Sequence, residues 1–190
     1  MEHANRVDFS GQTIYIGIDV HKKSWTVSLF LEHLEHKTFT QLPEVAPLVS
    51  YLHRHFPGAS YRAVYEAGYC GFWVHDRLVE NGIVCMVTNP ADVPTRDKER
   101  RRKGDRSDSR KLARCLRSAQ VEGIHVPTRA RTEDRGLIRT RQAMVRKQTR
   151  CKNQIKSLLL FYGFPTPEES RSWSRNYIRW LEGLRFERES

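Results

Sequence analysis

Four acidic residues stand where their carboxylates could share metal ions. Asp19 lies at the end of a segment in which apolar and other residues alternate, as in a β-strand. Glu66 lies at the end of a second predicted strand further along the chain. Asp105 and Asp108 lie three residues apart where a helix is expected to begin, so their side chains share one helix face. Since that face continues into apolar residues, we expect both acids to point toward the sheet.

Carboxylates that converge at one end of a sheet repel one another unless cations lie between them. Mg²⁺ suits such a site because it takes hard oxygen ligands and usually keeps several waters. Two such ions about 4 Å apart can activate a nucleophile and stabilise the leaving oxygen in phosphoryl transfer. Each acid taken singly has a simpler explanation, as a loop-edge residue or as a helix N-terminal acid favoured by the helix dipole. The order of all four acids along the chain favours a shared metal site over these separate explanations.

Basic residues indicate the partner that these acids would face. The chain of 190 residues has 33 Lys and Arg against 22 Asp and Glu, a net charge of +11, which favours DNA or RNA. The basic loop near residue 100 is either a phosphate-binding segment or a solvated charge run. His21 either positions a phosphate or water or is only a turn residue. The expected nucleic-acid contacts are Lys22, Lys23, Arg96, Lys98, Arg100, Arg101, Arg102, Lys103, Arg106 and Arg110.

Other classes of protein fit the sequence less well. An anionic membrane surface could also attract the basic charge, but no run approaches the ~18 apolar residues of a spanning helix. The polar segment 1–11 does not resemble a signal peptide. The four cysteines include no C-x-x-C pair, which argues against zinc and indicates reduced thiols in a cytoplasmic protein.

The patterns around the acids predict a mixed sheet in an α/β domain. Three strands are expected first, as an antiparallel meander, and helices and strands then alternate. The run 83–87 is continuously apolar, as in a buried parallel strand. The strands are expected at 13–19, 25–29, 37–41, 61–66 and 83–87, with helices at 45–56, at 72–81 and from about Asp105.

A different pattern follows Pro127. Leu137, Met144, Cys151 and Leu158 fall seven residues apart, which predicts a helix over about 132–162, roughly 45 Å long. A helix of that length implies a coiled-coil or helical-hairpin partner, either a second chain or the folded-back tail. A last short helix is expected to place Trp173, Tyr177, Trp180, Leu181 and Leu184 on one face. We therefore expect an α/β domain at 1–127, a long coiled-coil-type helix at 128–164 and a short helical segment at 165–190.

Three motifs, in this order along the chain, resemble a known family. They are IGIDVHK at 16–22, YEAG at 65–68 followed by Gly71 and Phe72, and GDRSDSRKLA at 104–113. Together they resemble the DEDD transposases of the insertion-sequence one-ten family, which are related to the Piv/MooV invertases. The resemblance covers nearly the whole chain, including the long helix and the tryptophan-bearing segment after it.

The resemblance implies an RNase H-like, more specifically RuvC-like, domain in which Asp19, Glu66, Asp105 and Asp108 bind Mg²⁺ and form the catalytic tetrad. It implies cleavage and exchange of DNA strands during transposition of an insertion sequence, with a structured guide RNA as a second partner. Recombination joins paired DNA ends, so a homo-oligomer formed through the long helix is also expected.

The sequence departs from the family pattern in two ways. Members usually continue into a second domain that supplies a nucleophilic serine, so this chain is expected to be the N-terminal half of such a protein. Ser109 stands where the family usually has alanine. Two alternatives therefore stay open: a catalytically incomplete fragment for nucleic-acid binding and dimerisation, or a nuclease that resembles a Holliday-junction resolvase.

Overall fold

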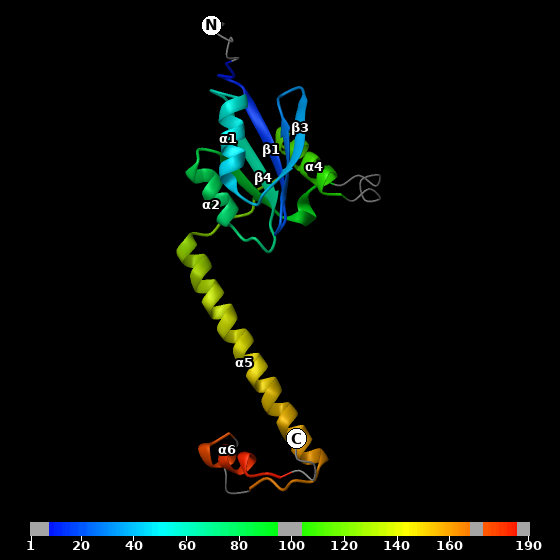
Figure 1. The fold of residues 1–190 in the computed structure, drawn as a ribbon, viewed down its shortest axis with the longest axis vertical. Coiled ribbons are helices and arrows are strands. Elements are labelled where there is room, and N and C mark those ends of the chain that lie inside the picture. Colours follow the sequence, from blue (N-terminus) through cyan, green and yellow to red (C-terminus); the bar gives the residue numbers. More distant parts are fainter. Residues whose placement is uncertain (1–7, 95–103, 168–172, 186–190) are drawn as a thin grey trace. The chain divides into compact units, whose positions relative to one another are not determined.

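The computed structural model describes residues 8–94, 104–167 and 173–185, in two compact units, Met1–Val126 and Pro127–Ser190. In the first unit, α1 and α2 cover one face of a five-stranded sheet, and α4 covers the other face (Figure 1). The elements of this unit are β1 (Thr13–Val20), β2 (Trp25–Phe30), β3 (Glu35–Gln41), α1 (Val45–His55), β4 (Ser60–Glu66), α2 (Trp73–Glu80), β5 (Val84–Thr88), η1 (Pro90–Asp92) and α4 (Asp105–Arg117).

The sheet is mixed, with the strand order β3-β2-β1-β4-β5. The first three strands pair antiparallel, while β4 is parallel to both β1 and β5. This arrangement confirms the predicted α/β class and is that of an RNase H-like fold. The strands and helices predicted for this unit all form, with ends that shift by one or two residues.

The prediction of a buried strand at 83–87 was wrong in part. β5 is parallel to β4, as expected, but it lies at the edge of the sheet. Val84 at its start is 64% exposed, and only Val87 and Thr88 are buried. An edge strand has one neighbour and less cover, so apolar character alone overestimated its burial.

Helix α4 approaches β1 very closely at Gly17. A Cβ atom built on Gly17 would overlap the carbonyl oxygen of Ser109 and the amide nitrogen of Ala113. Alternate residues of a strand point to opposite faces, so Gly17 and Asp19 share the face under α4, whereas Ile16 and Ile18 belong to the core under α1 and α2. The absent side chain thus lets the helix backbone lie against the strand that carries Asp19.

Buried hydroxyl groups fix α4 against the antiparallel strands. The Ser109 hydroxyl, which is fully buried, lies 2.8 Å from the Ser28 hydroxyl, and Ser28 is also 2.8 Å from the Thr38 hydroxyl. Arg110 donates from Nε to the Thr38 hydroxyl at 3.0 Å and forms an ion pair with Glu35 at 2.6 Å. The serine at position 109 is therefore a member of a hydrogen-bonded network between α4, β2 and β3.

The second unit contains α5 (Arg129–Phe161) and α6 (Arg175–Glu182). The Thr128 hydroxyl accepts from the Arg131 amide, so α5 begins a few residues earlier than predicted. Leu159 is the only residue of α5 that is buried, at 3% exposure. No helix among the described residues combines the length and apolar character needed to span a membrane.

The end of the second unit has a small aromatic cluster. Tyr177 is buried, and its ring lies 5.4 Å from that of Trp173 and 5.2 Å from that of Trp180. The Lys152 ammonium of α5 lies 5.3 Å from the Trp173 ring. Ser174 caps α6, so Trp173 and Leu184 flank the helix, and the predicted five-residue face was too long.

The contact at Gly17 predicts a large effect of one methyl group. Gly17→Ala should lower the free energy of unfolding by about 3 kcal/mol, because two backbone atoms of α4 must move. Gly136→Ala is the matched control, since a Cβ at this exposed position of α5 meets open space and alanine favours helix by up to about 1 kcal/mol. Urea unfolding measures both, and a Gly17 variant as stable as the control would contradict the close approach.

Candidate metal centre

Two of the four acids come together at the ends of neighbouring strands. In the parallel pair of β1 and β4, Ile18 is opposite Tyr65. Asp19 and Glu66 are the next residues on the two strands, so both stand at the carboxyl end of the central sheet. Parallel strands end at the same edge, which explains why residues 47 positions apart in the sequence become neighbours.

A third acid reaches this place from the covering helix. Asp108, in the first turn of α4, lines a cleft of about 200 Å³ together with Asp19, His21 and Glu66. Leu112, one turn further along α4, forms part of the same cleft and is buried. Asp108 and Leu112 therefore share the inward face of the helix, as the sequence pattern predicted.

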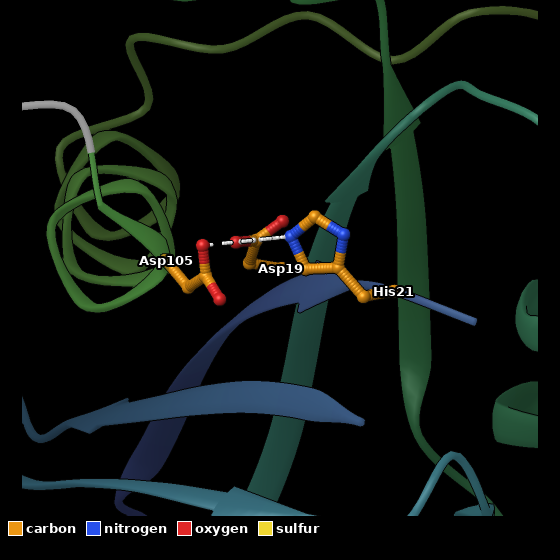
Figure 2. Close-up of side chains that lie close together, drawn as sticks. All are labelled: Asp19, His21 and Asp105. Carbon is orange, nitrogen blue, oxygen red and sulfur yellow. Dashed lines mark hydrogen bonds and ion pairs between the residues drawn. The ribbon is translucent and has the colours of Figure 1, made fainter. Parts of the chain in front are cut away.

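Asp105 lies at the rim, and His21 connects it to Asp19 (Figure 2). The Nε2 atom of His21 is 3.2 Å from Asp19 Oδ2 and 3.6 Å from Asp105 Oδ1. One possible ligand atom from each of the three residues lies within 4.8 Å of the others. The Asp105 side chain is 62% exposed, against 20% for Asp19, so Asp105 points less deeply inward than predicted.

The cleft makes ionisation of its acids unfavourable. Burial raises the pKa of Asp19, and the negative charges of Asp105 and Asp108 raise it further, while His21 partly offsets the rise. Burial also raises the pKa of Glu66, with added repulsion from Asp108 and Asp19 and a partial offset from Lys111. A divalent cation would relieve both the burial cost and the repulsion. Carboxylate oxygens are ligands that suit a hard divalent ion such as Mg²⁺.

The predicted nucleic-acid contacts have different surroundings. Lys22 and Lys23 are exposed in the turn between β1 and β2, immediately after His21, and Arg106 is exposed in the first turn of α4. Arg110 is engaged with Glu35 and Thr38 within the chain. The predicted loop contacts lie outside the described residues: Arg96, Lys98, Arg100, Arg101, Arg102 and Lys103.

Sequence reasoning missed one polar group at the rim. The Tyr69 hydroxyl donates to the Val20 carbonyl at 3.1 Å, although the residue is 69% exposed. This bond joins the loop after β4 to the end of β1. Tyr69 lies between the YEAG motif and Gly71, and the pairing of β1 with β4 brings it beside Val20.

Fold and cleft together define a class of protein: an RNase H-like domain with carboxylates gathered at the ends of its central strands. The sequence profile of the IS110-type DEDD transposases, described as "Transposase", matches residues 16–164. The chain belongs to this family of transposases. Membership also implies the use of a divalent metal, which agrees with the acidic cluster and its histidine.

Named relatives agree with this assignment. Two proteins of Sinorhizobium fredii named as candidate transposases are 31% identical over 123 residues, 65% of this chain, and 36% identical over 117 residues, 58% of this chain. The transposase for insertion sequence element IS1533 of Leptospira borgpetersenii is 23% identical over 183 residues, 93% of this chain. The matches span only 31%, 28% and 52% of those relatives' own lengths.

The raised pKa of Asp19 predicts that Asp19→Asn stabilises the metal-free fold. The carboxyl binds its proton more tightly in the folded than in the unfolded state, so its ionisation at neutral pH lowers the free energy of unfolding. Asparagine removes that cost, and we expect a gain of about 1 kcal/mol at pH 7 in EDTA. The gain should shrink as pH falls toward about 4, because the carboxyl of the folded state, whose pKa is raised, binds its proton before that of the unfolded state.

Urea unfolding across pH 4–8 measures this effect. Glu32→Gln, at an exposed position in the β2–β3 turn, is the control and should change stability by less than about 0.5 kcal/mol. Added Mg²⁺ should stabilise wild type more than Asp19→Asn. Destabilisation by Asp19→Asn at pH 7 would show instead that Asp19 supports the fold.

Proposed function

We propose that this chain supplies the Mg²⁺-dependent strand-cleavage centre of an insertion-sequence transposase, with Asp19, Glu66, Asp105 and Asp108 as the metal-binding tetrad of a RuvC-like domain. The observation that carries the proposal is the cleft shared by Asp19, Glu66 and Asp108, with Asp105 linked to it through His21. Burial and mutual repulsion raise the pKa of Asp19 and of Glu66, as expected of ligands arranged for a cation.

Each residue of the cleft has a distinct part in this proposal. When bound, Mg²⁺ would supply a hydroxide-generating and charge-stabilising centre for phosphodiester chemistry. Asp19 and Glu66, on rigid strand ends, provide the fixed ligands. Asp108 faces them from α4, and the more exposed Asp105 is free to turn inward. His21, between Asp19 and Asp105, holds the two carboxylates in place at 3.2 and 3.6 Å.

DNA is the substrate, and its backbone is held by basic residues around the cleft. Lys22, Lys23 and Arg106 support this role, because they are exposed within four residues of Asp19 or Asp105 along the chain. The predicted contacts from Arg96 to Lys103 belong to the same proposal, and they lie outside the described residues. Arg110 contributes less, because its charge is already paired with Glu35.

The proposal includes the family's second partner, a structured guide RNA, and its second catalytic group, a serine on a further domain. The net charge of +11 supports binding of more than one nucleic acid. In this scheme, residues 1–127 form the domain that cleaves DNA. Residues 128–164 mediate self-association, and residues 165–190 connect to the serine-bearing domain. RNA that co-purifies with the chain and resists DNase would support the guide, and its absence under low salt would count against it.

Plasmid nicking tests the cleavage centre. Wild-type chain should nick supercoiled DNA in Mg²⁺ but not in EDTA, and Asp19→Asn should reduce the rate by at least about 100-fold, since a metal ligand is lost. Glu32→Gln should nick at the wild-type rate. Wild-type chain that binds DNA yet never nicks it would contradict the proposal and favour the fragment that only binds nucleic acid.

Self-association through α5 is the remaining part of the proposal. The heptad residues Leu137, Met144 and Leu158 are exposed, at 72%, 65% and 48%, so the second unit by itself leaves them uncovered. In the described part of the chain, the segment after α5 covers only the far end of the helix, near Leu159 and Lys152. A second copy of α5 would bury these heptad residues, which we call the heptad seam.

Light scattering tests the dimer. Leu158→Asp should convert a dimer to a monomer, because a carboxylate in the seam loses its hydration without a partner. Leu160→Asp introduces the same charge two residues away, outside the seam, and should stay dimeric. Wild-type chain that is monomeric with α5 folded would contradict the proposal.

A further inference from the structure

A row of arginines runs along one side of α5. Arg131, Arg135, Arg139, Arg146 and Arg150 are separated by four, four, seven and four residues. Because an α-helix turns once every 3.6 residues, the five side chains fall within about 100° of arc and extend over roughly 28 Å. All five are exposed. We refer to them as the arginine row.

Positive charge predominates along the helix, and its two acids lie near the N-terminal end. The sequence of α5 has ten Lys and Arg but only two acids, Glu133 and Asp134. Glu133 projects on the side opposite the arginine row, where Leu137 and Met144 form the heptad seam. Asp134 lies between that side and Arg131, next to the N-terminal end of the row. Glu133 pairs with Arg129 at 2.9 Å, and Arg129 does not belong to the row. Apart from its N-terminal end beside Asp134, the row is thus a positive surface to which α5 contributes no acid, and it does not overlap the seam.

The chemistry of this side suits a phosphate backbone. Arg146 and Arg150 line an open hollow with Asn153 and Ser157, so neutral hydrogen-bonding groups continue the row. Guanidinium groups can hold phosphate oxygens with two hydrogen bonds each, which favours phosphate over a diffuse counterion cloud. Single-stranded nucleic acids are usually held by aromatic stacking, but α5 has no aromatic residue before Phe161. A duplex fits this surface better.

We infer that the arginine row binds the phosphate backbone of double-stranded DNA. This inference rests on the chain's membership in the transposases, but it does not depend on the metal site or on cleavage. The row gives affinity without sequence preference, because it offers phosphate contacts and no group aimed at base edges. Since the row lies opposite the heptad seam, DNA binding and pairing through the seam use different sides of α5.

Salt-dependent binding tests the inference on the whole chain. Fluorescence anisotropy in EDTA, with a 30-base-pair DNA duplex, keeps cleavage and metal binding out of the measurement. The row variant carries Arg139→Gln, Arg146→Gln and Arg150→Gln. The control carries Arg141→Gln, Lys147→Gln and Lys152→Gln, which removes the same charge from sides of the same helix outside the row. Circular dichroism checks that both stay helical, as glutamine permits.

The row variant should bind at least about tenfold more weakly, and its slope of log K against log salt should be shallower by about 2 to 3, since three phosphate contacts are lost. The control should lose less than about threefold. Equal losses in both variants would overturn the inference, because they would reflect net charge alone. An unchanged row variant, or wild-type binding tighter to RNA duplex or single strand than to DNA duplex, would overturn it as well. Failure of plasmid nicking with these results intact would concern only the metal centre.

Discussion

The backbone of α4 lies against β1 at Gly17, where no side chain stands between them, and the geometry of the cleft depends on this contact. Two residues further along β1, Asp19 faces the same side of the sheet, and the first turn of α4 holds Asp105 and Asp108. A bulkier residue at Gly17 would push the helix away from the sheet. The hydroxyl network of Ser109, Ser28 and Thr38 then fixes the helix laterally, since buried hydroxyls without partners are costly.

This contact gathers carboxylates that repel one another. Asp19 and Glu66 both have raised pKa values, and the burial that the fold imposes is the main cause. A domain selected for stability alone would not retain this arrangement, whereas a domain that must bind a cation needs it. His21 stands beside Asp19 and Asp105 and reduces the repulsion from within the chain.

The sequence predicted much of this domain because its signals are local. Alternating apolar residues located β1, β2 and β4, and the strand-end positions of Asp19 and Glu66 followed from that pattern. The three-residue spacing of Asp105 and Asp108 indicated a shared helix face, and Asp108 does enter the cleft. Membership in the DEDD transposases was likewise expected from the three motifs and agrees with the match over residues 16–164.

Contacts that depend on the pairing of distant segments could not be predicted. Ser109 looked like a mild departure from the family pattern, yet its hydroxyl meets Ser28, 81 positions earlier in the chain. Arg110 was expected to contact nucleic acid, but the position of β3 pairs it with Glu35. The partner of α5 is also beyond sequence patterns, because a heptad seam looks the same whether a second chain or a folded-back tail covers it.

The central claim is that the approach of α4 to β1 builds a site for divalent cations. Crystals of the chain soaked in Mn²⁺ test it directly, because the anomalous scattering of manganese locates the ion without assumptions about activity. The account predicts a peak bound to carboxylate oxygens of Asp19 and Glu66, with Asp105 or Asp108 as a further ligand, at about 2 Å from each. A cleft that stays free of manganese, with peaks only at other carboxylates, would contradict it.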